Sequence, residues 1–193
     1  MVRAILDGRK TQTRRVVKPQ PTLVRDPDYS GGAFLQFAKG KLAVGPKTVS
    51  GGDLCPYGVV GDRLWVRERL ELDKEGWVYA AGGDLIQNDS DAAIGWMESR
   101  PAKSSVCSPI HMPRWASRIT LEITGVRVER LQGISEADAE AEGVDGNCPV
   151  GNVREYQKGP HSYHYAQLWD SINGEGSWAA NQWVWAITFK RIK

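Results

Sequence analysis

The strongest constraint on the fold is the alternating segment at residues 118–131. Ile119, Leu121 and Ile123 are separated by single polar residues, and Val126 and Val128 continue the alternation. A period of two places the apolar side chains on one face of a β-strand. Gly125 interrupts the segment, and a glycine inside a strand typically marks a bend or a bulge. The chain therefore contains a long strand that must pair within a sheet.

The remaining pattern predicts a mixed α+β fold. Residues 2–6 have the spacing of one helical face, and Gly8 follows where a left-handed residue ends a helix. Ser135 begins a Ser-x-x-Asp start for a second helix that ends at Gly143. Further elements are expected at residues 11–17 (extended), 63–68 (strand, with 77–81 as its hairpin partner), 161–172 (helix) and 181–192 (strand).

The length favours a single domain. The chain has 193 residues and 41% hydrophobic content, enough to bury one core. Residues 19–60 and 82–116 are rich in glycine, proline and polar residues, so we expect them to be irregular insertions. The first holds short candidate strands at 33–37 and 41–44. We therefore predict one domain over 1–193 with these two insertions.

Composition narrows the cellular setting and the cofactors. No apolar run approaches the roughly 20 residues of a membrane span, and no signal-peptide core is present, so we expect a cytoplasmic protein without a membrane partner. Three widely spaced cysteines, at 55, 107 and 148, indicate reduced thiols. Cys107 and His111 have a spacing that zinc sites use, but no CxxC pair supports it. We expect neither a metal nor a cofactor.

Positive charge is concentrated near the start of the chain. Residues 1–19 hold six Lys or Arg and one acid, whereas the whole chain carries only +2. Most of these cations lie in the basic run of residues 8–15, which includes Arg9, Lys10, Arg14 and Arg15. Such a run fits one anionic ligand, such as a nucleotide or an RNA backbone. From charge alone, a solvated basic turn fits equally well.

Aromatic residues offer a second route to nucleic acid. The chain has eight tryptophans, of which Trp115 is flanked by Arg114 and Arg118. Aromatic rings stack on unpaired bases, with nearby cations holding the backbone. Trp115 and Arg118 are therefore candidate ligand contacts, although most tryptophans in a chain of this kind belong to the core.

Four separated pieces resemble the ASCH domain family, a branch of the PUA-like superfamily of small β-barrels. The Gly-x-Lys-x-x-Thr-x-Arg signature of that family is met by Gly8, Lys10, Thr13 and Arg15 after the helix at 2–6. The other pieces are the turn and strand at 61–66, the strand and helix at 119–143, and the strand at 183–192. The insertions are not covered, and the chain looks particularly like longer members carried by bacteriophages and prophages.

The resemblance implies a small mixed β-barrel with flanking helices and long loop insertions. Family members carry a strand before the signature helix, whereas this sequence begins in that helix. Either the barrel has one strand fewer, another segment replaces that strand, or the natural start lies upstream.

The resemblance also implies a function. ASCH domains are taken as RNA- or nucleotide-binding modules, and some small bacterial members are amidohydrolases that deacylate acetylcytidine with a Lys, a Thr and a Glu. Those three correspond here to Lys10, Thr13 and Glu142. Thr13 would supply a hydroxyl or position a water, and Lys10 would act as a base if burial or neighbouring cations lower its pKa. Glu142 would relay protons or orient the substrate amine. Alternatively, Glu142 pairs with a charged Lys10 and the site only binds.

Three functions therefore remain open at the level of sequence. The first is binding of RNA, a nucleotide or a modified nucleoside through Gly8, Arg9, Lys10, Thr13, Arg14, Arg15 and Glu142, with Trp115 and Arg118 as further contacts. The second is hydrolysis of an acylated cytidine or, more remotely, of RNA phosphodiesters. The third is a phage accessory protein whose barrel contacts other proteins.

Overall fold

The computed structural model describes residues 1–25, 33–37, 42–44, 55–100, 104–144 and 160–193. The helices and the longer strands have the following bounds: α1 (Val2–Leu6), β1 (Gln12–Val16), β5 (Arg63–Trp65), α2 (Asp91–Ser99), β9 (Thr120–Arg130), α3 (Glu136–Ala141), α4 (His161–Asn173) and β10 (Trp183–Arg191). The short strands are β2 (Thr22–Arg25), β3 (Ala33–Gln36), β4 (Leu42–Val44), β6 (Leu70–Leu72), β7 (Trp77–Tyr79) and β8 (Val106–Cys107).

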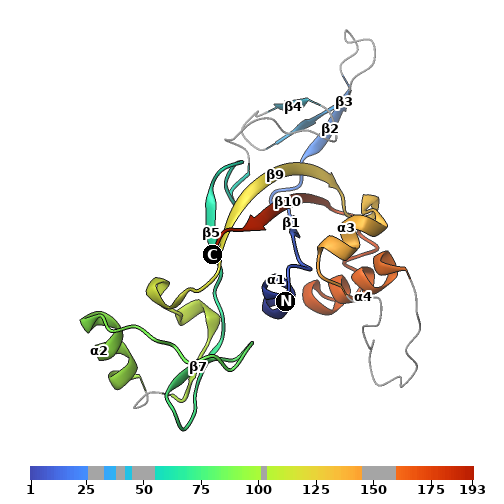
Figure 1. The fold of residues 1–193 in the computed structure, drawn as a ribbon. Helices are drawn as coiled ribbons and strands as arrows, with labels where there is room; N and C mark the ends of the chain where they lie inside the picture. The colour runs from blue at the N-terminus through green and yellow to red at the C-terminus, as the bar shows by residue number, and fades with distance from the viewer. Residues whose placement is uncertain (26–32, 38–41, 45–54, 101–103, 145–159) are drawn as a thin grey trace.

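The centre of the molecule is a curled antiparallel sheet that forms half a barrel. Its strand order is β1-β10-β9-β5, and the long β9 and β10 arch across the middle of the molecule (Figure 1). Ile123, Val128 and Trp185 are buried in the main core against this sheet. The chain is therefore a mixed α+β protein built on a half-barrel, which confirms the sheet and helices expected from the patterning.

A β-bulge explains how β9 keeps one face buried over its whole length. Thr188 pairs with Gly125, but the next residue of β10, Phe189, pairs with Ile123. One residue of β9 is thus left over at the glycine, as predicted. The extra residue shifts the alternation by one position, so Ile123 and Val128 both face the core although five positions separate them. Bulges also increase local twist, which suits a curled sheet.

Three helices gather at the β1 side of the half-barrel. α1, α3 and α4 lie together there, and α3 contacts both α4 and β1 (Figure 1). α1 ends as predicted, because Gly8 adopts a φ of +74° and turns the chain back toward β1. α3 also begins as predicted, with the Ser135 hydroxyl accepting a hydrogen bond from the Asp138 backbone N–H at 3.1 Å.

The predicted hairpin between residues 63–68 and 77–81 is wrong. β5 pairs with β9, whereas β7 pairs with β6 in a separate sheet of order β7-β6-β8. The strand at β5 stops at Trp65, and the chain then crosses to the second sheet. Glu68 is fully buried in this crossing, where its carboxylate binds Arg118. Alternation alone could not reveal that a buried ion pair interrupts the strand.

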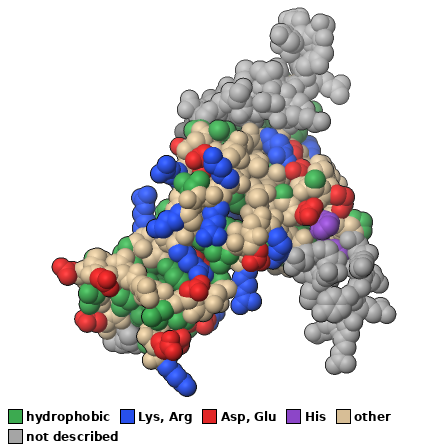
Figure 2. Space-filling model, in the orientation of Figure 1, with side chains coloured by type: hydrophobic (Ala, Val, Ile, Leu, Met, Phe, Trp, Pro, Cys, Tyr) green, Lys and Arg blue, Asp and Glu red, His purple; other side chains and the backbone are tan. Residues whose placement is uncertain are grey.

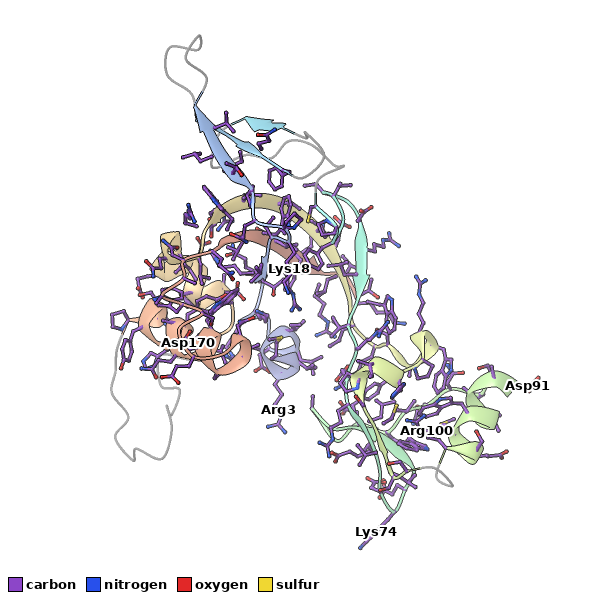
Figure 3. The ribbon with its side chains drawn as sticks, turned by 180° about the vertical axis from the view of Figure 1, so that it is seen from behind. Arg3, Lys18, Lys74, Asp91, Arg100 and Asp170 are labelled. Carbon is purple, nitrogen blue, oxygen red and sulfur yellow. The ribbon has the colours of Figure 1, made fainter. Side chains whose placement is uncertain are left out.

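Both predicted insertions contain regular structure. In the first, β3 and β4 are confirmed at the expected places, and an unpredicted strand, β2, completes a three-stranded sheet. In the second, α2 and β8 pack with β6 and β7; we call these four elements the β6–β8 unit. Seen from behind, Asp91 and Arg100 lie near the two ends of α2 in this unit, while Lys18 and Asp170 lie at the half-barrel and α4 (Figure 3).

The β6–β8 unit has its own aromatic core. The Trp96 ring lies 5.2 Å from Trp77 and 5.7 Å from Trp115, measured between centroids. Arg3 of α1 reaches this unit, donating from Nε to the Ala81 carbonyl oxygen at 2.7 Å.

Among the described residues, no helix is long and apolar enough to cross a membrane.

Candidate functional site

Backbone hydrogen bonds join the basic run to the ends of α1 and α3. After the turn at Gly8, the Lys10 backbone N–H donates to the Ala4 carbonyl at 2.8 Å, and the Thr11 N–H donates to the Ala141 carbonyl at 2.8 Å. Lys10 and Glu142 form an isolated antiparallel bridge. Backbone pairing therefore brings together two residues that lie 132 positions apart in the sequence.

Lys10 and Glu142 form a buried ion pair. The Lys10 Nζ lies 2.7 Å from Glu142 Oε2 and 2.8 Å from both the Glu142 and the Gln12 carbonyl oxygens. The two side chains are only 4% and 5% exposed. Burial lowers the pKa of Lys10 from its usual value, and the Glu142 charge opposes this only in part. The ammonium group is held by three acceptors, yet it is easier to deprotonate than a surface lysine.

Arg14 lies beside this pair and is completely buried. Its Nη1 donates to Gln12 Oε1 at 2.6 Å and to Glu142 Oε1 at 3.2 Å. Its Nε and Nη2 donate to Glu129 Oε1 at 3.0 Å and 2.5 Å. The guanidinium is therefore surrounded by protein acceptors on the inward face of β1.

Arg127 completes the arrangement from β9. Its guanidinium contacts Glu129 Oε2 at 2.9 Å and Asp138 Oδ1 at 2.8 Å. Burial raises the pKa of Asp138, but hydrogen bonds from Gln12 and Arg127 outweigh this effect and leave that pKa below its usual value. We call the six charged residues of this arrangement the pocket network: Lys10, Arg14, Arg127, Glu129, Asp138 and Glu142.

Tyr165 of α4 covers the network. Its hydroxyl donates to Glu142 Oε1 at 3.4 Å, and its ring centroid lies 5.9 Å from the Arg14 guanidinium carbon. Burial and the Glu142 charge both raise the pKa of Tyr165, so the phenol stays protonated and remains a donor.

A pocket of about 180 Å³ opens between β1, the end of α3 and α4. Part of its wall comes from the basic run and α3, and the rest from the apolar face of α4. The lining residues are Met1, Lys10, Thr13, Arg14, Arg15, Val16, Glu142, Gly143, Tyr165, Leu168, Trp169, Ile172 and Asn173. The three residues of the predicted catalytic set, Lys10, Thr13 and Glu142, all belong to this wall.

The other residues predicted in the basic run have different surroundings. Arg15 is exposed and lines the pocket, while Thr13 beside it is half-buried. Arg9 is ion-paired with Asp7 at 3.1 Å, and Gly8 forms the exposed turn between α1 and the pocket.

Gly143 allows the close approach of the basic run. Its φ is +78°, a left-handed conformation, and a Cβ at this position would lie 2.9 Å from the Cβ atoms of Ala4 and Lys10. No side chain fits here without displacing the segment that carries Lys10. The glycine that ends the α3 region is therefore also part of the site's construction.

Trp115 and Arg118 lie in a different environment. Trp115 is half-buried against Trp96 in the β6–β8 unit. Arg118 donates to Glu68 at 2.9 Å and 3.0 Å, also pairs with Asp84, and lies 4.0 Å from the Tyr79 ring centroid. Neither residue lines the pocket, so the structure does not bring them together with Lys10 and Thr13.

Sequence reasoning missed the deeper part of the site. Arg127 and Glu129 occupy the polar positions of an alternating strand, which usually face solvent, and Asp138 lies in a short acidic helix. The one available signal was Tyr165, on the predicted apolar face of residues 161–172. Its hydroxyl marks it as a residue that needs a polar partner when buried.

The described residues contain no cluster of side chains suited to binding a metal ion. No group of three or more His, Cys, Asp or Glu there could hold a metal ion. Cys55 and Cys107 are buried free thiols, and burial raises the pKa of both. Cys148 lies outside the described residues.

Figure 2 shows Lys and Arg side chains spread over the middle of one face of the molecule, interspersed with acidic ones. Positive charge is thus not gathered into one uninterrupted patch on this face.

Comparisons with family models, with curated proteins and with solved structures find no match to this chain.

Proposed function

We propose that the pocket binds a nucleoside or nucleotide group in the manner of an ASCH domain, and that Lys10, Thr13, Arg15 and Glu142 contact it. The observation that carries this proposal is the convergence of these residues on one pocket from two distant parts of the chain. The signature spacing predicted three of them, and the resemblance added Glu142. The half-barrel with a helix before β1 supports a PUA-like architecture.

The pocket's size favours a single nucleoside over a folded nucleic acid. At about 180 Å³ it lies below the typical range of roughly 300–1,000 Å³ for drug-sized ligands. A base or an acylated base fits this scale, with the sugar at the mouth. Arg15, exposed at the pocket, is the cation best placed to meet a sugar phosphate or an RNA backbone.

A second function, hydrolysis of the amide of an acylated cytidine, is favoured by the state of Lys10. A lysine base must be neutral, and burial already lowers the pKa of Lys10. Glu142 can accept the proton that Lys10 loses, because Glu142 Oε2 lies 2.7 Å from the Lys10 Nζ. The resulting amine would take a proton from the Thr13 hydroxyl or from a water beside it.

The reaction would add one water across the amide. The attacking oxygen bonds to the acyl carbon, the carbon–nitrogen bond breaks, and the proton held by Lys10 or Glu142 passes to the cytidine amine. If a water attacks, this step gives the free acid directly. If the Thr13 hydroxyl attacks, the step leaves an acyl-threonine ester, which a water then hydrolyses to the free acid, restoring the hydroxyl. The products are the free acid and cytidine, and Lys10 and Glu142 return to their starting protonation.

Substitutions of Thr13 distinguish binding from hydrolysis, and we expect them to leave the fold intact. We expect Thr13→Val to lose more than about 100-fold of acetylcytidine turnover, measured by chromatography, while Thr13→Ser keeps most of it. Thr124→Val, at an exposed position of β9, is the matched control. All variants should show wild-type melting temperatures.

Each result has a definite reading. Unchanged turnover in Thr13→Val would exclude the hydrolytic role of that hydroxyl. Saturable binding of acetylcytidine without turnover, by folded protein, would leave binding as the function. Absence of both binding and turnover for acetylcytidine, cytidine, cytidine monophosphate and single-stranded RNA would overturn the proposal.

A further inference from the structure

The pocket network is electrically balanced. Lys10, Arg14 and Arg127 supply three positive charges, and the carboxylates at 129, 138 and 142 supply three negative ones. All six side chains are at most 27% exposed, and those of Lys10, Arg14 and Glu142 at most 5%. A ligand entering the pocket therefore meets cations whose charge is already neutralised by the protein.

The hydrogen-bonding capacity of the two innermost cations is also in use. The Lys10 ammonium has three N–H groups and three oxygen acceptors within 2.8 Å. Arg14 directs donors to Gln12, Glu129 and Glu142. An anion could bind either cation only by displacing a buried carboxylate or amide, which leaves a charged or polar group unpaired.

Part of the pocket lining is apolar. Leu168 and Trp169 of α4 and Val16 of β1 also line the pocket. Ile172, 60% exposed, extends this apolar surface to the mouth. Such a surface suits an uncharged planar or aliphatic group.

We propose, on the basis of the nucleoside-binding function above, that the pocket excludes anions and takes an uncharged group, so that its ligand is a nucleoside or free base and any phosphate stays outside near Arg15. The basic run is thus mainly a structural element of a neutral pocket. Arg15 is the exception, because its guanidinium makes no ion pair with the described residues.

Two consequences distinguish this pocket from an anion site. First, a 5′-phosphate should improve binding by less than about fivefold, the most that one exposed ion pair contributes. Second, that small gain should disappear as salt rises, since an exposed pair is screened. An anion site lined by unpaired buried cations would show a much larger gain that resists salt.

The test uses the full chain and three probes: acetylcytidine or cytidine, cytidine 5′-monophosphate, and inorganic phosphate. Calorimetry gives the affinities, and nitrogen-15 NMR of the Lys10 ammonium reports entry into the pocket. We expect the nucleoside to shift the Lys10 signal saturably and phosphate to leave it unchanged. Arg15→Gln should remove the small advantage of the monophosphate, and Arg63→Gln, which changes an exposed arginine on β5, should not.

The outcomes separate this inference from the function on which it rests. A saturable shift of Lys10 with phosphate, or a monophosphate advantage above about fivefold, overturns anion exclusion while nucleotide binding survives. If no nucleoside or nucleotide binds and phosphate leaves Lys10 unchanged, the proposed function fails and the exclusion of anions stands.

Discussion

Two ion-pair clusters lie at opposite ends of β9, and one of them contributes to the pocket described above. The pocket network uses Arg127 and Glu129 near the end of β9. The second cluster, which we call the Arg118 cluster, comprises Arg118, Glu68 and Asp84 just before β9 begins. Glu68 and Glu142 have almost equally buried side chains, at 0% and 5% exposure.

The surroundings give the two clusters different roles. Arg118 contacts the Tyr79 ring, the Glu68 carboxylate in the crossing between the two sheets, and Asp84 after β7, and so it holds the β6–β8 unit to the half-barrel. Lys10 and Glu142 instead form part of a wall that a ligand can reach. A buried ion pair is thus weak evidence for a site by itself, and the adjoining cavity makes the difference.

The largest effect on stability is expected for Glu142→Ala. Removing this carboxylate leaves Lys10 and Arg14 buried beside each other with too little negative charge, which costs about 3–5 kcal/mol of unfolding free energy. Urea denaturation measures the loss. A loss below about 1 kcal/mol would show that water from the pocket compensates the cations.

A smaller loss is expected for Glu68→Ala. Arg118 is 20% exposed and keeps Asp84 as a partner, so we expect a loss of about 2–3 kcal/mol. Nucleoside binding, measured by calorimetry, should be unchanged, because the Arg118 cluster does not line the pocket. Weaker binding in folded Glu68→Ala would break the distinction between the two clusters.

The next expected losses of unfolding free energy come from a comparison of two glycines. Gly143→Ala places a Cβ 2.9 Å from Lys10 and requires a left-handed residue, so we expect a loss of about 2–3 kcal/mol together with weakened ligand binding. Gly8→Ala has the same backbone demand but open space around it, so about 1 kcal/mol is expected. Equal losses would mean that the close approach to Lys10 contributes nothing.

The smallest effect concerns pH and Asp138. Its folded-state pKa is below the usual 3.8, so the carboxylate contributes stability above that pH, and the contribution disappears as the pH falls through the folded pKa. With its side chain 25% exposed, solvent screening limits the contribution to about 0.5–1 kcal/mol. Asp138→Asn should lose this amount at pH 7 and progressively less as the pH falls below 3.8. Parallel wild-type and variant profiles across that range would contradict the assignment.

The sequence predicted the elements that depend on local pattern. The long strand at 118–131, the bulge at Gly125, the helix stop at Gly8 and the cap at Ser135 all follow from periodicity and backbone preference, which act over a few residues. The resemblance of the basic run to the ASCH signature also implied Lys10 and Thr13 as candidates. The hairpin partner of β5 was missed, because strand pairing depends on contacts far apart in the chain.

The site shows the same division. The residue types of the basic run, and the correspondence with Glu142, were available from the sequence by itself. Only the tertiary structure decided that Arg14 faces inward and that Arg118 belongs to another cluster. It also decided that Arg127 and Glu129, at polar positions of β9 that alternation predicts to face solvent, join Arg14. The charges of a segment can be read from its own residues. The burial and pairing of those charges depend on which distant elements pack together. Folding therefore pairs Arg9, Lys10 and Arg14 of the basic run with carboxylates of the protein.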